Sequence, residues 1–376
     1  MERYLSNFIK QDLHNKIVLL AGARQCGKTT LSKNLGFEYD YFNIDNNEHF
    51  SSVSKKYWDR SKELLILDEF HKFKNWKKFI KGVYDTEGIN PKILITGSAR
   101  LDSFTNVGDS LAGRYFHYRL HPIDIKEAYQ YLNISPDDAL VNLLQCSGFP
   151  EPFLKQQKTY YKRWRKTHHD IILQQDLIDL TLVKDVKSVR LMAKLLEERI
   201  GGSVNYSNLA QDLQVSSNAV KSWLEILENI YMFFKVTPYS KNIARSILKE
   251  PKIYCYDTAI PENKGAKIEN LVACCLIKHL DFLEDVRGKK TSLNYCRTKD
   301  GKEIDFVVKV EEETYLIEVK HSDHEVSPHF GYFAKYFDKP NCIQLVKNLN
   351  KEYSNQQGYK VVKLAEWLAN IDLNIK

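Results

Sequence analysis

This sequence lacks the features of secreted and membrane proteins. No segment approaches the roughly 20 consecutive apolar residues of a membrane span, and the first ten residues, MERYLSNFIK, carry charges where a signal peptide needs an apolar core. The seven cysteines form no CxxC pair, which gives neither the usual spacing of a zinc site nor a disulfide framework. We therefore expect a cytoplasmic protein with buried, reduced thiols and no membrane contact.

Internal repeats, low-complexity segments and a Gly-x-Ser-x-Gly stretch are also missing, so covalent serine-hydrolase chemistry has no support. What is present is the composition of a globular protein, with 376 residues of which 43% are apolar and 27% charged. This length allows two or three domains. The net charge of +7 favours an anionic partner such as nucleic acid, although a basic surface also serves solubility.

The first third of the chain alternates short apolar segments with helix-like segments. The apolar segments predict strands, and their nearly continuous apolar character is typical of a parallel sheet covered on both faces. They are KIVLLAG, YDYFNID, ELLILDEF, KILITGSA and RYFHYRL. We predict an α/β ATPase-type core over residues 1–125. The pattern then turns helical over 126–195, which we assign to a helical lid or linker.

A glycine-containing loop, GARQCGKTT, follows the first predicted strand and opens a helix. Its spacing, Gly-x4-Gly-Lys-Thr, is that of the phosphate-binding P-loop or Walker A motif. Backbone N–H groups and the helix N-terminus would face the phosphates of ATP, Lys28 would neutralise their oxygens, and Thr29 would ligate Mg²⁺. The alternative is a turn with a chance Lys-Thr pair. The residues predicted to hold the nucleotide are Gly22, Ala23, Arg24, Gln25, Cys26, Gly27, Lys28, Thr29 and Thr30.

Polar residues at the ends of the later strands predict that the bound ATP is hydrolysed. At the end of LLILDEF, the Walker B position, Asp68 would join the Mg²⁺ shell and Glu69 would polarise the attacking water. Thr96, in ITGSAR, would position this water, or would only form a tight turn. In SLAGRY, Arg114 would stabilise charge on the γ-phosphate, in cis or from a neighbouring subunit, with Arg100 as the rival candidate. Either arginine could instead form a surface salt bridge.

The order GARQCGKTT, LDEFHKFKNW, ITGSAR, SLAGRYF resembles the AAA+ superfamily. It looks most like a group of prokaryotic ATPases that carry a C-terminal domain of long-uncertain function. The resemblance covers most of the chain, including GFPEPFL and PKIYCYDTAI. It implies a strand between the two that bear the Walker motifs. It also implies a homo-oligomeric ATPase, with a hexameric ring as the expected assembly.

The segment 196–260 has the element order of a winged helix-turn-helix. A short helix over 207–213, a turn, a second helix over 218–229 and a β segment follow one another. The early turns of the second helix would contact a DNA groove. In the alternative, this unit docks a protein. The residues predicted to contact DNA here are Asn218, Lys221 and Ser222.

Further basic residues are candidates for phosphate contacts. The run KTYYKRWRK interleaves basic and aromatic side chains, and its Arg163 and Arg165 would track a phosphate backbone. Alternatively, the aromatic residues of this helix face the core and the charges face water. Arg297, in RTKDGKEIDF, is a third candidate.

Acidic and basic residues converge in the C-terminal segment 261–376. EIDFVVKV and TYLIEVKH read as two strands, and period-two alternation places Asp305, Glu318 and Lys320 where they can meet on one side of a hairpin. With Glu269, from the helix AKIENLVACC, the set resembles the PD-(D/E)xK nuclease core. This resemblance implies that the carboxylates hold Mg²⁺ and that the lysine steadies the nucleophile. Such folds also persist as binding or structural modules.

The sequence therefore predicts an α/β protein with a P-loop AAA+ core, a helical lid, a winged helix-turn-helix and a small restriction-nuclease-like α/β domain. We expect an ATP-hydrolysing machine that translocates, remodels or branch-migrates duplex or branched DNA, with ATP-gated cleavage as a variant. The alternative is a nucleotide-controlled, oligomerising switch or scaffold. Its C-terminal domains would bind protein and its nuclease-like fold would be inert.

Overall fold

A computed structural model describes residues 2–98, 111–173, 177, 185–240, 250–322 and 325–373. Its N-terminal part is a five-stranded parallel sheet in the order β2-β3-β4-β1-β5. The strands are β1 (Ile17–Gly22), β2 (Tyr39–Asn43), β3 (Leu64–Asp68), β4 (Lys92–Gly97) and β5 (Tyr115–Leu120). β1 and β3 are buried along their whole length, as their apolar sequences require. The predicted parallel sheet is confirmed.

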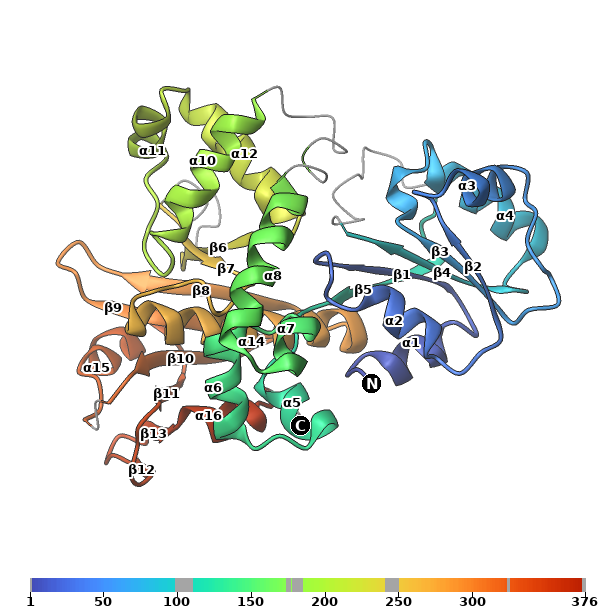
Figure 1. Ribbon diagram of the computed structural model, residues 1–376. Coiled ribbons are helices and arrows are strands. Elements are labelled where there is room, and N and C mark those ends of the chain that lie inside the picture. The colour runs from blue at the N-terminus through green and yellow to red at the C-terminus, as the bar shows by residue number, and fades with distance from the viewer. Residues whose placement is uncertain are drawn as a thin grey trace.

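β4 lies between β1 and β3, so one strand separates the P-loop strand from the strand that ends in Asp68. Because all five strands run the same way, their carboxyl ends meet at one edge of the sheet. Figure 1 shows helices α1 and α2 on one face of this sheet and α3 and α4 on the other. The helices of this part are α1 (Ser6–Asp12), α2 (Lys28–Lys33), α3 (Asn47–Ser54), the 3-10 helix η1 (Phe70–Lys72) and α4 (Trp76–Glu87).

Helices follow the first sheet, and side-chain caps mark where α5, α6 and α10 begin. The Asp124 carboxylate accepts the N–H of Glu127 at the start of α5, and Ser135 accepts the N–H of Asp138 at the start of α6. Figure 1 shows α8 rising from α7 toward α10 and α12. These helices are α5 (Ile125–Leu132), α6 (Pro136–Cys146), α7 (Pro150–Lys155), α8 (Lys158–Ile171) and α10 (Val186–Glu197).

The next unit has the predicted order of helix, turn, helix and strand. It consists of α11 (Tyr206–Leu213), α12 (Ser217–Asn229), β6 (Phe233–Pro238) and β7 (Lys252–Cys255). Each helix begins one residue earlier than expected. Gln214, with a φ of 55°, makes the turn, and the Ser216 hydroxyl accepts the N–H of Ala219 at the start of α12. α10, α11 and α12 share one apolar core with β6 and β7.

The C-terminal part is built on a sheet of eight strands in the order β12-β13-β11-β10-β9-β8-β6-β7. β6 and β7 therefore belong to the same sheet as the C-terminal strands. The expected hairpin of β9 and β10 is present and antiparallel. The elements are α14 (Lys264–Arg287), β8 (Thr291–Arg297), β9 (Glu303–Val310), β10 (Glu313–Lys320), α15 (His329–Phe333), η3 (Ala334–Tyr336), β11 (Asn341–Val346), β12 (Tyr353–Ser354), β13 (Lys360–Lys363) and α16 (Leu364–Ala369).

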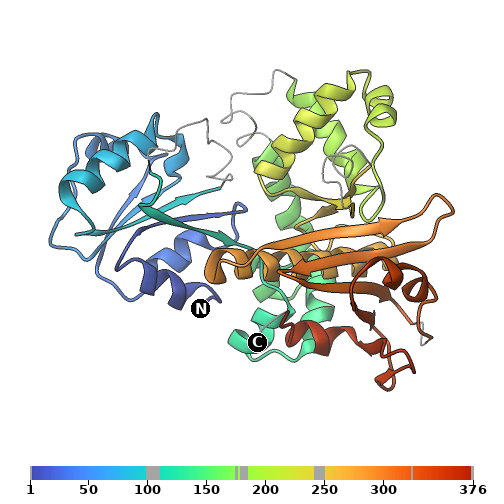
Figure 2. The same cartoon turned by 180° about the vertical axis from the view of Figure 1, so that it is seen from behind.

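The long helix α14 connects the two sheets. It packs on strands β7 to β10 and reaches β5 of the N-terminal sheet, as Figure 2 shows from behind. α16 returns to pack on α5 and α6. Within the described residues, none of the helices, α14 included, combines the length and the apolar character that a membrane crossing needs.

Candidate nucleotide-binding site

The loop between β1 and α2 requires glycine at two positions. Gly22 has a φ of 156°, and a Cβ atom there would lie 2.3 Å from the carbonyl oxygen of Leu120. Gly27 precedes α2 with a φ of 99°, in the left-handed region that side chains disfavour. The curled backbone therefore depends on the two glycines of the motif.

A cavity of about 430 Å³ opens beside this loop. Five of the nine predicted nucleotide residues line it, and they are Gln25, Gly27, Lys28, Thr29 and Thr30. Ala23 and Cys26 are buried behind the loop. Leu31 and Glu69 also line it, and the rest of the wall is formed by Arg3 and by α7, at Pro150, Glu151 and Leu154. Sequence reasoning missed Arg3 and the α7 residues, because they lie far from the loop along the chain.

Lys28 is buried inside the curl of the loop, with 5% of its surface exposed. Its Nζ donates to the carbonyl oxygens of Gly22 and Ala23, each at 2.9 Å. A positive charge is thereby held where the loop and the N-terminus of α2 present backbone N–H groups. Such a combination suits an anion such as phosphate.

Asp68, at the end of β3, is held by three hydroxyl groups. Its Oδ2 accepts from Thr29 Oγ1 at 2.8 Å and from the Tyr41 hydroxyl at 2.7 Å, and its Oδ1 accepts from Thr96. Burial and the Asp68 carboxylate raise the pKa of Tyr41, which keeps this phenol protonated as a donor. Thr96 is fully buried, so it orients Asp68 and does not face the cavity. Tyr41 was missed from the sequence.

Glu69 adopts a left-handed backbone conformation, with a φ of 54°, directly after β3. Non-glycine residues in this region are uncommon and cluster at functional sites. The Ser98 hydroxyl donates to Glu69 Oε2 at 3.1 Å, and His71 Nδ1 lies 3.6 Å from the same oxygen. Burial lowers the pKa of His71, so its ring is neutral at pH 7 and leaves the Glu69 charge in place.

A buried charge network holds the N-terminal segment against the loop. The Arg3 guanidinium donates to the Cys26 carbonyl oxygen at 2.7 Å and pairs with Glu127. From α14, Lys278 Nζ donates to Glu127 at 2.6 Å and to Asp124 at 2.9 Å. Burial alone would raise the pKa of Glu127, but the two cations outweigh it and lower this pKa to about 2. The network joins the P-loop to α14.

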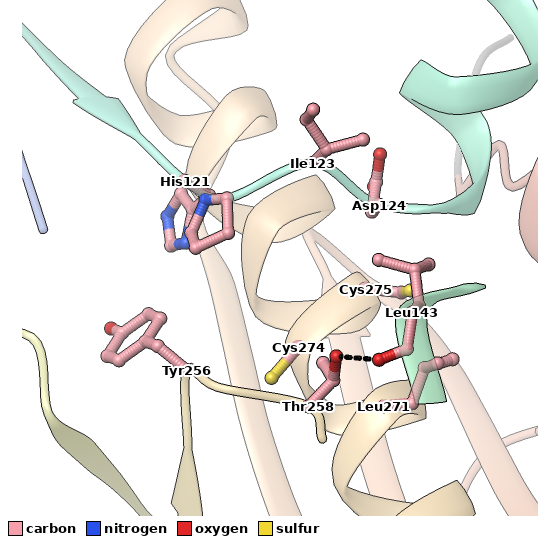
Figure 3. Close-up of a pocket in the computed structure, with 10 residues that line it drawn as sticks. His121, Ile123, Asp124, Leu143, Tyr256, Thr258, Leu271, Cys274 and Cys275 are labelled. Carbon is pink, nitrogen blue, oxygen red and sulfur yellow. Dashed lines mark hydrogen bonds between the residues drawn. The ribbon is translucent and has the colours of Figure 1, made fainter. Parts of the chain in front are cut away.

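The same junction encloses a cavity of about 10 Å³, shown in Figure 3. Its walls come from the segment after β5, from α14 and from the segment after β7. The Thr258 hydroxyl donates to the Leu143 carbonyl oxygen at 2.7 Å across one side of it. The Nε2 of His121, which also lines it, lies 2.7 Å from the Asp281 carboxylate. This volume is that of about one water molecule, so the junction is closely packed and is not a ligand site.

Helix α8 also touches the P-loop. His168 Nε2 lies 3.3 Å from the carbonyl oxygen of Arg24, and the His168 ring stacks on Trp164 with centroids 4.3 Å apart. Burial lowers the pKa of His168 to about 4. The ring is therefore neutral at pH 7, and it donates to the carbonyl through Nε2–H.

Arg114 lies at the opposite end of the sheet from the P-loop. Its carbonyl oxygen accepts the N–H of Ile17, at the start of β1. At ~3.3 Å per residue, roughly 17 Å of strand separate Ile17 from Gly22. The Arg114 guanidinium pairs with Asp85 on α4 at 3.0 Å. A cis role at this cavity is therefore excluded by geometry, whereas a role from a neighbouring subunit stays a prediction. Arg100 lies outside the described residues.

Arg114→Ala is accordingly expected to leave the ATP turnover of dilute, unassociated protein within about twofold of wild type, since exposed substitutions away from a site have small effects. If Arg114 acts on a neighbour, the variant should lose only the extra turnover that appears as protein concentration rises. Turnover per chain against protein concentration measures this, with Arg60→Ala, another exposed arginine paired to a carboxylate, as control. A loss at every concentration would contradict the geometry.

The predicted C-terminal set does come together. Lys320 Nζ donates to Glu318 Oε1 at 2.9 Å. Burial, together with repulsion from Glu269 and Glu318, raises the pKa of Asp305. Lys252 of β7, which sequence reasoning missed, lies among these carboxylates. In the part of the chain that the structure describes, no group of three or more His, Cys, Asp and Glu side chains is placed to hold a metal ion. Mg²⁺ binding here stays a prediction.

The predicted DNA contacts differ in their exposure and in their pairing within the chain. Arg165 pairs with Glu197 at 2.8 Å, and Arg297 lies 3.4 Å from the Glu303 carboxylate. Both guanidinium groups contact carboxylates of the chain, but the Arg297 side chain is still 49% exposed. The exposed candidates are therefore Arg297, Arg163 on α8, and Asn218, Lys221 and Ser222 on α12.

Comparison with known families assigns an AAA domain to residues 14–129. Residues 137–263 and 264–367 match two families described as domains of unknown function, DUF8612 and DUF4143. An uncharacterized protein of Haemophilus influenzae is 22% identical over 98% of both chains. Another uncharacterized protein, MJ1544 of Methanocaldococcus jannaschii, is 24% identical and matches over 78% of this chain and 72% of its own.

Two solved structures resemble the chain weakly. The replication initiator DnaA bound to AMPPCP and single-stranded DNA has a TM-score of 0.30 at 16% identity, covering 59% of this chain and 86% of its own. A Pyrococcus horikoshii signal transduction ATPase with numerous domains (STAND) has a TM-score of 0.25 at 13% identity, covering 75% of this chain and 45% of its own.

Proposed function

We propose that this protein hydrolyses ATP and uses the reaction to act on DNA. One arrangement of side chains supports the hydrolysis of ATP. Lys28, the hydrogen-bonded pair of Thr29 and Asp68, and Glu69 meet at the carboxyl edge of the parallel sheet, beside a cavity. The backbone N–H groups of the loop and the Lys28 ammonium would hold the phosphates there.

Glu69 is the residue that would activate water. Its carboxylate would accept a proton from water as the water oxygen bonds to the γ-phosphorus and the bond to the ADP oxygen breaks, which yields ADP and phosphate. The Ser98 hydroxyl, at 3.1 Å, would fix the orientation of this carboxylate. The neutral His71 ring beside it would leave its negative charge available for the proton.

Thr29 and Asp68 fit a magnesium ion. Mg²⁺ prefers oxygen ligands, and the Thr29 hydroxyl and an Asp68 carboxylate oxygen already lie 2.8 Å apart next to the P-loop. The ion would stabilise negative charge on the phosphate oxygens. The hydroxyl groups of Tyr41 and Thr96 would keep the Asp68 carboxylate in position.

The basic face of α8 supports DNA as the partner. The inward side of this helix is apolar, with Tyr161 and Trp164 buried, and its His168 contacts the P-loop. A phosphate backbone on the outward side would lie on the same helix that touches the nucleotide loop. DNA binding could in this way affect ATP turnover. The exposed basic residues are Lys158, Lys162, Arg163 and Lys166.

A second candidate function is a nucleotide-controlled switch or scaffold that binds protein. The pairing of Arg165 with Glu197 favours it, because it engages one of the predicted DNA-binding residues inside the chain. Under this function, ATP would change the association of subunits, hydrolysis would be slow, and α11 and α12 would dock a protein.

The triple substitution Lys162→Glu, Arg163→Glu and Lys166→Glu tests the DNA proposal. Wild-type turnover is expected to rise with duplex or branched DNA, and the triple variant is expected to keep its basal turnover but lose this stimulation. For every phosphate that the variant no longer neutralises, the slope of log affinity against log salt should become shallower by about 0.9. ATP turnover and DNA binding across salt concentrations measure both effects.

A matched control reverses three exposed lysines elsewhere, with Lys55→Glu, Lys351→Glu and Lys360→Glu. It carries the same change in net charge and should keep the stimulation. If duplex, forked and single-stranded DNA all leave wild-type turnover unchanged and bind no better than a neutral polymer, the DNA proposal is wrong. The switch function would then be tested by subunit association with and without ATP.

A further inference from the structure

Lys252 lies at the centre of the C-terminal carboxylates. Its side chain is 3% exposed, and its Nζ is 2.9 Å from Glu269 Oε1 and 3.8 Å from Asp305 Oδ1. It also pairs with Glu303. These carboxylates come from α14 and from β9, whereas the lysine comes from β7. A buried lysine therefore occupies the space between side chains that the sequence pattern brings together as metal ligands.

One oxygen of each predicted metal-ligand carboxylate in the cluster accepts a hydrogen bond from this chain. The Tyr254 hydroxyl donates to Glu269 Oε1 at 2.6 Å, so this oxygen already has two donors. Asp305 Oδ2 accepts the backbone N–H of Val319 at 2.8 Å. Glu318 Oε1 accepts from Lys320, while its Oε2 is buried and has no hydrogen-bond partner. Among the described residues, this oxygen is a buried carboxylate oxygen of the cluster that lacks a hydrogen-bond partner.

We propose that the Lys252 ammonium is the built-in cation of this carboxylate cluster and that it excludes divalent metal ions. The C-terminal unit is then locked in a form that does not cut nucleic acid. A magnesium ion needs oxygen atoms at 2.0–2.1 Å, and it cannot share Glu269 and Asp305 with an ammonium in the same space. Two cations at such a distance would also repel each other strongly.

The backbone of Lys252 is held by strand pairing on both sides. Lys252 pairs with Val236 in the β6–β7 ladder and forms a bridge with Ser203 on its other side. Nearby, a Cβ atom on Gly201 would lie 3.7 Å from Glu269 Oε2, which shows how closely this loop approaches α14. A flexible surface lysine could swing away from a competing metal ion, but this side chain is buried and its ammonium is paired with Glu269 and Glu303.

The inference is tested by manganese binding to the full chain without nucleotide or DNA, so its outcome is separate from that of the proposed function. Free Mn²⁺ is followed by electron paramagnetic resonance. Wild-type protein and its Asp305→Asn variant are expected to bind Mn²⁺ equally weakly. Lys252→Met should bind Mn²⁺ at least about tenfold more tightly than wild type, because carboxylates without their cation attract a divalent ion. The double variant Lys252→Met, Asp305→Asn should lose this gain.

The control is Lys351→Met, which removes an exposed lysine and should bind Mn²⁺ as wild type does. The inference is overturned if wild-type protein binds Mn²⁺ tightly and Asp305→Asn or Glu318→Gln removes that binding. It is also overturned if folded Lys252→Met gains no Mn²⁺ affinity. Should Lys252→Met fail to fold, the comparison of wild type with Asp305→Asn and Glu318→Gln still decides.

Discussion

Glu69→Gln is expected to bind ATP like wild type and to hydrolyse it about 100- to 10,000-fold more slowly, the usual contribution of a general base. Glutamine keeps the length of the side chain, and its carbonyl oxygen can still accept from Ser98, which lies 3.1 Å from the carboxylate. It cannot accept the proton of the attacking water. Steady-state phosphate release gives the turnover, and titration with a fluorescent ATP analogue gives the affinity.

Two further variants make the result interpretable. Glu38→Gln removes a carboxylate of the same domain that is 74% exposed, and its turnover should stay at the wild-type value. Lys28→Ala should lose ATP binding itself, because it removes the charge inside the loop. If Glu69→Gln retains more than half of the wild-type turnover, another group activates water. If Lys28→Ala binds ATP normally, the nucleotide does not bind at the P-loop.

Lys278→Met is expected to lower the free energy of unfolding by about 3–5 kcal/mol, the usual result of removing one partner of a buried ion pair. Lys278 is 4% exposed at its side chain and donates to both Glu127 and Asp124. Methionine fills a similar volume but leaves these carboxylates with fewer donors. Urea unfolding followed by circular dichroism measures the change. Lys264→Met, on the exposed start of α14, is the control and should shift the midpoint little.

The same network gives a pH dependence with a defined sign. The pKa of Glu127 is about 2 in the folded protein, below the ordinary 4.5, so the ionised carboxylate stabilises the fold above pH 4.5. This contribution, about 3 kcal/mol, should disappear as pH falls from about 5 to about 2. Lys278→Met should show a shallower loss over this range. An equal acid sensitivity in wild type and variant would mean that Glu127 is not held by Lys278.

Features encoded by neighbouring residues were predictable from the sequence. The P-loop, the Asp68-Glu69 pair after a buried strand, and the parallel sheet each depend on local patterns of glycine, apolar and acidic residues. The hairpin that brings Asp305 and Glu318 together followed from the alternation of side chains along two strands. In each case a short stretch of sequence contains the whole signal.

The remaining parts of the sites depend on partners far apart in the chain. Arg3 meets Glu127 across 124 positions, and nothing in either local sequence indicates the pairing. Lys252 stands alone in an apolar strand, so its role is visible only once β7 is placed beside α14. Arg165 was predicted to contact DNA from its charge alone, and its pairing with Glu197 on α10 was not visible in the local sequence.

Helix α14 also decides how the chain can be divided. At 24 residues it is about 36 Å long, and its Glu269 binds Lys252 of β7 while its Asp285 binds Arg119 of β5 at 2.7 Å. A protein shortened to end before this helix would leave Arg119 facing solvent without its carboxylates. A fragment that starts at this helix would likewise leave Asp285 without Arg119. The chain therefore cannot be divided at residue 263 into two fragments that each keep these ion pairs.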